Sequence, residues 1–176
     1  YDRQPFPGEY LKSLISDGNG GFIEFEYTNL VSFYHGGATG DYYNDGDLDV
    51  LVVEAGGGQS AIYENNNGIL TANLELIDQS LMPSMSNAEL YDFNNDGYLD
   101  IICGGHDWQW NSTEYDTTPL IIYGDGGSYV GNESIRLPET GIYGQGVVTD
   151  FNFFDLDDDG MDEIIITRTG AYLQYE

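Results

Sequence analysis

Residues 92–100 combine oxygen-bearing side chains at alternating positions with a glycine between them. With Asp92 as position 1, oxygen ligands fall at positions 1, 3, 5 and 9, and Gly97 occupies position 6. Short carboxylate and amide side chains at this spacing can converge on one point, and the glycine permits the sharp turn that brings them together. Hard cations such as Ca²⁺ are bound by oxygen ligands in this way. The stretch therefore predicts a calcium-binding loop, although a single acidic glycine loop can also be read as a solvated turn.

The same pattern occurs in two further places. Residues 155–163 are complete, with Glu163 at position 9, whereas residues 41–49 carry Tyr43 at position 3, where an oxygen ligand is expected. Each of the three stretches is followed by a run of β-branched and aliphatic residues, which favours a strand after the loop. Three copies of one spacing, each leading into such a run, favour cation binding over three unrelated turns.

The loops differ from EF-hands in their second half. An EF-hand needs a bidentate Glu at position 12 and a helix on each side. Position 12 is Val52, Cys103 or Ile166 here, and the flanking runs are β-rich. EF-hands and dockerin modules are therefore disfavoured.

Composition limits the partners. The chain has 176 residues, with 31 acidic and 4 basic side chains and a formal net charge of −27. This charge argues against nucleic acid and anionic membrane as partners, and no apolar run is long enough for membrane insertion. The single cysteine, Cys103, excludes an internal disulfide and is expected to be a buried thiol. Because the chain starts at Tyr1 in the middle of a pattern, we expect a mature fragment or part of a longer protein.

A repeated unit surrounds the acidic loops. A strand rich in Gly, Ala and Ser leads into the loop, an apolar strand leads out, and a variable loop and a two-stranded hairpin follow. The loops begin 51 and 63 residues apart. Four antiparallel strands at this period predict an all-β fold of β-propeller blades or a stacked array. We expect one propeller segment over residues 1–176, divided into a partial blade, two blades and a partial blade: 1–32, 33–84, 85–144 and 145–176.

The hairpins of the unit are predicted from turn residues. Asp17-Gly18-Asn19-Gly20-Gly21, Asn65-Asn66-Asn67-Gly68 and Asp125-Gly126-Gly127 each follow a short apolar run, and an aromatic or aliphatic residue follows the turn.

These loops and the strands after them resemble FG-GAP/VCBS-type repeats, the blades of the calcium-binding β-propeller in integrin α-subunit heads and many bacterial surface proteins. The resemblance implies that each loop joins the first two strands of a blade and holds one Ca²⁺, up to three in all. The implied ligands, with the backbone carbonyl at position 7, are Asp41, Asp45, Asp47 and Asp49; Asp92, Asn94, Asp96, Tyr98 and Asp100; and Asp155, Asp157, Asp159, Met161 and Glu163. Tyr43 departs from the pattern, which implies a weak first site or a gap filled by Asn44 or water.

The resemblance also indicates how many blades a closed propeller would need. The family usually closes a ring of about seven blades, and closed propellers need at least about four. Two blades and two partial blades would expose apolar faces and sheet edges at both ends. We therefore expect the remaining blades to come from the same parent protein, which we favour, or from neighbouring subunits.

A second candidate site follows the second loop. His106, Asp107, Trp108 and Trp110 lie in a long polar stretch, and Trp rings stack on sugar faces while carboxylates bind hydroxyls. The reading that we favour from the sequence is that both Trp side chains pack between blades. We expect the calcium loops to be structural, because an ion whose positions are all held by protein has none left for catalysis.

The sequence leaves three functions open. The favoured one is a calcium-stabilised binding or adhesion module, secreted or at the cell surface, that contacts glycan or protein and has no catalysis of its own. The second is a propeller domain of a secreted polysaccharide-degrading enzyme, a lyase or hydrolase. The third is a purely structural subunit of an extracellular assembly. The family resemblance supports any of these functions only by analogy.

Overall fold

The computed structural model describes residues 8–56, 58–105, 118–138 and 147–169, and all regular structure in these ranges is β-strand. The strands are β1 (Glu9–Ser16), β2 (Phe22–Ser32), β3 (Tyr34–Gly40), β4 (Asp49–Glu54), β5 (Ala61–Asn66), β6 (Ile69–Asn73), β7 (Met85–Tyr91), β8 (Asp100–Gly105), β9 (Leu120–Ile122), β10 (Ser134–Arg136), β11 (Val148–Phe154) and β12 (Glu163–Arg168).

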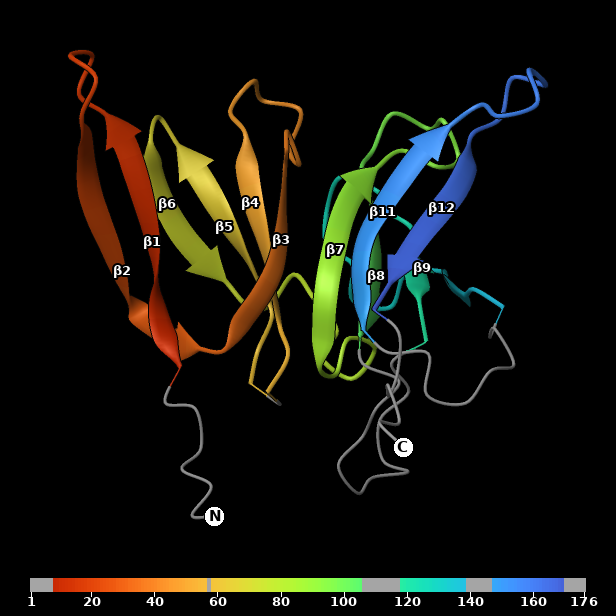
Figure 1. Ribbon diagram of the computed structural model, residues 1–176, viewed down its shortest axis with the longest axis horizontal. Helices are drawn as coiled ribbons and strands as arrows, with labels where there is room; N and C mark the ends of the chain where they lie inside the picture. The colour runs from red at the N-terminus through yellow and green to blue at the C-terminus, as the bar shows by residue number, and fades with distance from the viewer. Residues whose placement is uncertain (1–7, 57, 106–117, 139–146, 170–176) are drawn as a thin grey trace, which may run out of the picture.

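The strands form four antiparallel sheets that follow one another along the chain (Figure 1). Strands β3 to β6 and β7 to β10 form two four-stranded sheets in sequence order. Strands β1 and β2 form a two-stranded sheet before them, and β11 and β12 form another after them. The predicted all-β class, built from propeller-type four-stranded antiparallel sheets, is confirmed.

The first two strands of each repeat pair in the same register in all three repeats. Position 9 of the acidic loop pairs with the residue before position 1: Gly40 with Asp49, Tyr91 with Asp100, and Phe154 with Glu163. Each first strand also has an irregularity near its start, between Tyr34 and Gly36, Met85 and Asn87, and Val148 and Asp150. Bulges bend a strand and increase its twist. The three pairs therefore share the loop and also the bend that precedes it.

Apolar side chains fill the spaces between successive sheets in three clusters. The largest lies between the two four-stranded sheets and includes Leu51, Ile62, Ile101 and Ile122. A second joins the β7–β10 sheet to β11 and β12, and a third joins β1 and β2 to the β3–β6 sheet. Alternate residues of the central strands thus face opposite neighbours, as expected for sheets covered on both sides.

The small residues of the first strands allow the sheets to approach closely. A Cβ added at Gly36 of β3 would lie 2.7 Å from the carbonyl oxygen of Ser86 in β7. A larger side chain there would separate the two strands, because backbone atoms cannot move aside as a flexible side chain can. The composition of this strand, already visible in the sequence, is therefore a packing requirement.

Two of the three predicted hairpins are tight. Strands β5 and β6 are joined by Asn67 and Gly68, both with positive φ, and β1 and β2 by the turn from Asp17 to Gly21. The third prediction is only partly correct, because the chain bends at Asp125-Gly126-Gly127 but the return strand β10 begins at Ser134. The intervening residues place Tyr129 in the central cluster. Its hydroxyl donates to the carbonyl oxygen of Leu99 at 2.6 Å, and its backbone amide donates to that of Leu76 at 2.8 Å.

Candidate metal centre

The three acidic loops lie at the same end of their sheets. They connect β3 to β4, β7 to β8 and β11 to β12 (Figure 1). The first carboxylate of each loop is half-buried, whereas the side chains at positions 3 and 5 are exposed, among them the carboxylates of Asp45, Asp96, Asp157 and Asp159. Each loop thus places its acidic side chains at the rim, where a cation from solvent can reach them.

In every loop two backbone amides donate to the first carboxylate. Asp155 accepts hydrogen bonds from the amides of Asp159 and Gly160 at 3.0 and 2.8 Å. Asp41 accepts the equivalent pair at 2.9 and 3.0 Å, and Asp92 does so at 3.1 and 2.9 Å. The position-1 side chain therefore closes each loop around itself and fixes the direction of the carboxylate.

A second repeated feature is the left-handed backbone at positions 4 and 6. Position 6 is always glycine, with φ between 89° and 94°. Position 4 has φ between 54° and 60° and is Asn or Asp, the non-glycine residues that best tolerate this conformation. These residues are Asn44, Gly46, Asn95, Gly97, Asp158 and Gly160. The role of position 4 was missed by sequence reasoning, although the choice of Asn, Asn and Asp at that position was a usable signal.

The third loop brings three carboxylates together. Asp155, Asp157 and Asp159 each offer an oxygen, and these atoms lie within 4.8 Å of one another. Oxygen ligands of Ca²⁺ lie about 2.3–2.6 Å from the ion, so two ligands of one ion are at most about 5 Å apart. The donor type and the mutual distances both fit Ca²⁺.

The second loop replaces the middle carboxylate by an amide. The side chains of Asn94 and Asp96 meet, since Asn94 Nδ2 donates to Asp96 Oδ2 at 2.8 Å. Asn94 Oδ1 in turn accepts the backbone amide of Asp96 at 3.0 Å. The loop borders a polar pocket of about 480 Å³, lined by Asn94, Asp96, Tyr123, Gly124, Asp125, Asn132 and Glu133. This arrangement supplies oxygen ligands and leaves room for water beside the loop.

The first loop lacks a side-chain ligand at position 3. The hydroxyl of Tyr43 donates to Glu64 Oε1 at 2.7 Å, and Asn73 donates to the same oxygen at 2.6 Å. The side chain of Asn44 donates to the carbonyl oxygen of Gly97 in the second loop at 3.2 Å. Because Asn44 is engaged with the neighbouring loop, water is the better candidate for the gap that Tyr43 leaves.

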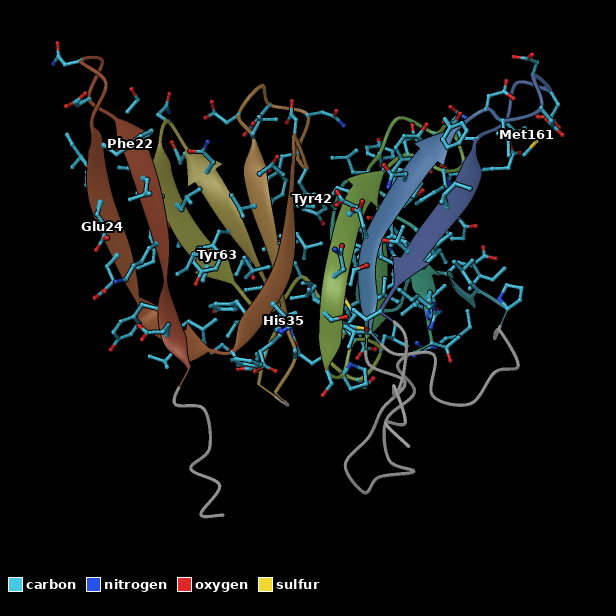
Figure 2. All side chains as sticks on the ribbon, in the orientation of Figure 1. Phe22, Glu24, His35, Tyr42, Tyr63 and Met161 are labelled. Carbon is cyan, nitrogen blue, oxygen red and sulfur yellow. The ribbon has the colours of Figure 1, made fainter. Side chains whose placement is uncertain are left out.

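Position 7 has the same backbone bond in all loops. The amides of Asp47, Tyr98 and Met161 donate to Oδ1 of the position-5 carboxylate at 3.0, 2.9 and 2.9 Å. The side chains of Tyr98 and Met161 are exposed, and Figure 2 shows Met161 on the third loop, which joins β11 to β12. These residues act on their loops through the backbone, in agreement with their expected role as carbonyl ligands, which stays a prediction.

The position-9 carboxylate closes the loop and, in the first two repeats, reaches the third strand. Asp100 accepts the amide of Phe93 at 2.7 Å and that of Gly124, after β9, at 2.8 Å. Asp49 accepts the amides of Tyr42 and Asn65 in the same way, at 3.1 and 2.8 Å. In the third loop Glu163 accepts the amide of Leu156 at 2.7 Å. The sequence identified position 9 as a metal ligand only, and its second role depends on a strand that lies farther along the chain.

Burial raises the pKa of both aspartates at position 9. Asp49 and Asp100 have at most 1% of their surface exposed. Loss of solvent raises the pKa of each carboxyl above its usual value, and the backbone amides that each one binds offset part of the rise. A nearby cation would act in the same direction as those amides, because positive charge favours the ionised carboxylate.

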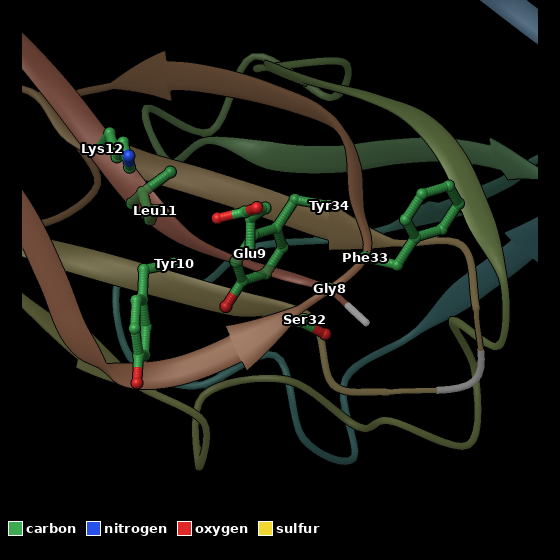
Figure 3. A pocket seen from close by; sticks show the side chains of 8 residues that line it. All are labelled: Gly8, Glu9, Tyr10, Leu11, Lys12, Ser32, Phe33 and Tyr34. Atoms are coloured by element: carbon green, nitrogen blue, oxygen red, sulfur yellow. The ribbon is translucent and has the colours of Figure 1, made fainter. Parts of the chain in front are cut away.

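The second candidate site, with His106, Asp107, Trp108 and Trp110, lies outside the described residues. Strand β8 ends and β9 begins at the end of the sheets opposite the acidic loops (Figure 1). At this end of the molecule lies a mainly apolar pocket of about 470 Å³, which sequence reasoning missed. Figure 3 shows its lining residues: Gly8, Glu9, Tyr10, Leu11, Lys12, Ser32, Phe33 and Tyr34.

Comparison with known proteins agrees with the repeats. Residues 41–103 match the family model described as FG-GAP-like repeat. This range begins at position 1 of the first acidic loop and ends in β8, after the second loop. This segment of the chain therefore matches FG-GAP-type repeats, as the sequence predicts. Such repeats form β-propeller-type modules that are typically extracellular. No curated protein and no solved structure matches the chain, and the described ranges contain no helix long and apolar enough to cross a membrane.

Proposed function

We propose that this protein is a calcium-stabilised β-propeller-type module, secreted or held at the cell surface, that binds a glycan or protein partner. The observation that carries the proposal is the shared geometry of the three acidic loops. The same amides bind the same carboxylates in each loop, although the intervening residues differ. A solvated turn has no need to keep this arrangement three times.

The calcium ligands in this proposal are those of positions 1, 3, 5, 7 and 9. The third loop offers Asp155, Asp157, Asp159, Glu163 and the carbonyl of Met161, and the second offers the equivalent set with Asn94 at position 3. The first loop offers fewer protein ligands and binds most weakly. When bound, Ca²⁺ neutralises carboxylates that otherwise repel one another within a nine-residue turn. The ion thus stabilises the connection between the first two strands of each blade.

The test is thermal unfolding with and without excess chelator, combined with elemental analysis of the purified protein. We expect two to three Ca²⁺ per chain and a melting temperature that falls steeply on chelation. Readdition of Ca²⁺ should restore the original melting temperature. Absence of bound Ca²⁺ together with an unchanged melting curve would reduce the loops to solvated turns.

We place the partner-binding surface at the opposite end of the sheets. The pocket there is bordered by Tyr10, Phe33 and Tyr34, and aromatic faces of this kind stack on sugar rings and cover apolar side chains of proteins. In the sequence, Trp108 and Trp110 follow β8 and precede β9, and these strands end and begin at the same end of the sheets. Separation of the two ends would let calcium stabilise the scaffold while the partner is bound elsewhere.

This part of the proposal is tested by glycan-array binding of the calcium-loaded protein. Tyr10→Ala and Trp110→Ala should each lower the signal of a bound glycan at least severalfold. Tyr98→Ala, which removes an exposed aromatic at the calcium end, should leave it unchanged. Equal losses in all three variants would show that the signal does not depend on the proposed surface.

A further inference from the structure

The first and last sheets are complementary halves of one repeat. In the two complete sheets the acidic loop joins the first and second strands, and a hairpin joins the third and fourth. Strands β11 and β12 flank an acidic loop and therefore correspond to strands one and two. Strands β1 and β2 form a hairpin that directly precedes the next first strand, as β5 and β6 do, and therefore correspond to strands three and four.

We propose that β12 of one copy of this chain pairs with β1 of a second copy, so that β11, β12, β1 and β2 complete a four-stranded sheet. In the described ranges β12 pairs only with β11, and β1 only with β2, so each has one free edge. The chain directions agree with the complete sheets, because β12 runs away from the acidic loop and β1 runs toward that end (Figure 1). The pairing would be antiparallel, like every strand pairing in the described part of the chain.

The faces of the two edge strands also match. Ile164 and Ile166 of β12 pack on the preceding β7–β10 sheet, so Ile165 faces the opposite way, toward the position of a following sheet. Leu11 of β1 packs on the following β3–β6 sheet, and Ile15 lies on the same face of its strand. A composite sheet would therefore present Ile165 and Ile15 on one face.

The register follows from the complete sheets. In the β7–β10 sheet Ile102, three residues after loop position 8, pairs with Ile121. Ile165 holds the position of Ile102 in the third repeat, and Ile15 holds that of Ile121 when Leu14-Ile15 is matched to Leu120-Ile121 before the turn. The composite therefore places Ile165 opposite Ile15. Leu14 then lies opposite Ile166, and both side chains share one face, as the pleat requires.

Exposure distinguishes the free edges from their buried equivalents. Ile102 and Ile121 are 0% and 4% exposed, whereas Ile165 and Ile15 are 39% and 44% exposed. Leu14 is exposed as well, although its equivalent Leu120 is buried. Exposed aliphatic edges are normally avoided in sheets because they pair with other chains. In the proposed pairing, the exposed aliphatic side chains of β12 and β1 would cover one another.

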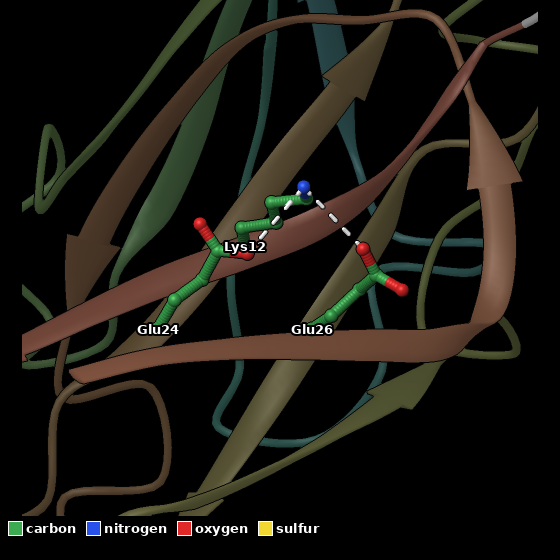
Figure 4. Close-up of polar contacts among 3 residues, drawn as sticks. All are labelled: Lys12, Glu24 and Glu26. Carbon is green, nitrogen blue, oxygen red and sulfur yellow. Dashed lines mark ion pairs between the residues drawn. The ribbon is translucent and has the colours of Figure 1, made fainter.

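The contact would also bring two of the few basic residues together with two glutamates. Lys12 of β1 bridges Glu24 and Glu26 of β2 at 3.6 and 3.4 Å, which leaves this group with one excess negative charge (Figure 4). In the proposed register Arg168 of β12 lies opposite Lys12 and faces the same side. Its guanidinium would make the group neutral, in a chain that otherwise has a large negative charge.

The assembly closes with two copies. The described ranges of one copy supply the strands of three four-stranded sheets, so two copies joined at both junctions give six, within the range of four to eight blades of known propellers. We expect a dimer of about 39 kDa, twice the 19.5 kDa of one chain. The inference does not depend on calcium, and the metal content of each sample is measured separately so that a failure of assembly and a failure of calcium binding are distinguishable.

The register is tested with two cysteine variants in the presence of Ca²⁺. Ile15→Cys and Ile165→Cys chains, carrying tags of different size, are mixed and oxidised. We expect a covalent heterodimer on non-reducing gels, because directly opposed residues of antiparallel strands lie within disulfide reach. The control is Ile15→Cys mixed with Ile135→Cys, whose site on β10 is similarly exposed and should give no heterodimer above background.

Light scattering tests the assembly itself. The unsubstituted chain should have the mass of a dimer, and Leu14→Lys should shift it to a monomer while circular dichroism still reports β-structure. A monomeric unsubstituted chain at the highest soluble concentration would overturn the inference, and so would equal crosslinking in the control mixture. Either result would assign the two edges to another segment or partner.

Discussion

At the scale of single residues, the loop carboxylates divide into two kinds. Asp45, Asp96, Asp157 and Asp159, at positions 3 and 5, are exposed, whereas Asp49 and Asp100 at position 9 are buried and bind backbone amides on two sides. The first kind is available to a cation. The second also holds the loop against its own sheet. Substitutions at the two kinds of position should therefore have different effects.

Asp157→Ala should weaken calcium binding at the third loop roughly tenfold, because it removes one charged oxygen ligand from the cluster around Asp155 and Asp159. Isothermal titration calorimetry of the chelated protein measures this change. Asp158→Asn is the matched control, since it removes one negative charge at the neighbouring position, where the side chain is not in the cluster and Asn tolerates the positive φ. Equal weakening in both variants would mean that only the local charge matters.

Glu89 of β7 gives a pH-dependent prediction away from the loops. Partial burial, together with the nearby Asp150, raises the pKa of its carboxyl above the ordinary 4.5. A raised folded-state pKa means that the stabilising effect of protonation is fully present below pH 4.5 and is lost as the pH rises through the folded-state value. Above its folded-state pKa, Glu89 is ionised at a cost in stability.

Glu89→Gln should therefore raise the melting temperature by about 1–3 °C at pH 7, and the difference from the unsubstituted protein should shrink toward pH 4. Calorimetry at both pH values measures it. Exposed Glu75 provides the control, because Glu75→Gln removes the same charge without relieving burial. A destabilised Glu89→Gln at pH 7 would contradict the argument.

At the scale of elements, the third strand is tied to the acidic loop in the β7–β10 sheet. Gly124, just after β9, donates its amide to Asp100, and a Cβ added there would lie 2.2 Å from the carbonyl oxygen of Leu99. The backbone must come this close for the buried carboxylate to be satisfied. The connection between loop and strand therefore depends on a glycine.

Gly124→Ala should destabilise the protein by more than about 2 kcal/mol, because the added methyl meets backbone that cannot move aside and threatens the hydrogen bond to Asp100. Denaturant unfolding in the presence of Ca²⁺ measures the change. Gly127→Ala, in the same connection, meets only the side chain of Asp125 at 3.1 Å and should cost less than about 0.5 kcal/mol. Similar costs for both variants would disprove the close approach.

At the scale of the whole molecule, the large negative net charge makes stability depend on cations. A formal charge of −27 opposes compact structure, and both site binding and general screening would relieve it. The two effects differ in specificity. Loops with flexible oxygen ligands favour Ca²⁺, which accepts six to eight ligands, over Mg²⁺, which needs a strict octahedron.

Chelated protein should therefore regain its melting temperature in low-millimolar Ca²⁺, and it should regain only a minor part of it in Mg²⁺ or in NaCl of equal ionic strength. Scanning calorimetry of the three samples against the calcium-loaded protein gives the comparison. Equal recovery in Mg²⁺ and Ca²⁺ would indicate screening without selective loops.

The sequence by itself determined the local parts of this protein. The acidic loops, the strands on either side and two of the three hairpins follow from it, because the groups that bind one another there lie within a few residues. The bond from the Gly160 amide to Asp155 spans five residues, and the left-handed turn at Asn67-Gly68 is encoded by the two residues that form it. Because apolar residues occur on both faces of the central strands, the sequence also indicates that these strands are covered by a neighbouring sheet on each side.

Only the tertiary structure decided how these parts meet. Asn44 is drawn to Gly97, 53 residues away, and Asp100 reaches an amide 24 residues farther on. Tyr129 lies in the central cluster because the connection between β9 and β10 is longer than the predicted tight turn. Such contacts depend on the order and spacing of sheets, which no local pattern encodes. The free edges of β1 and β12 likewise depend on the tertiary structure, because a strand edge is identified as free only when the pairing of the other strands is known.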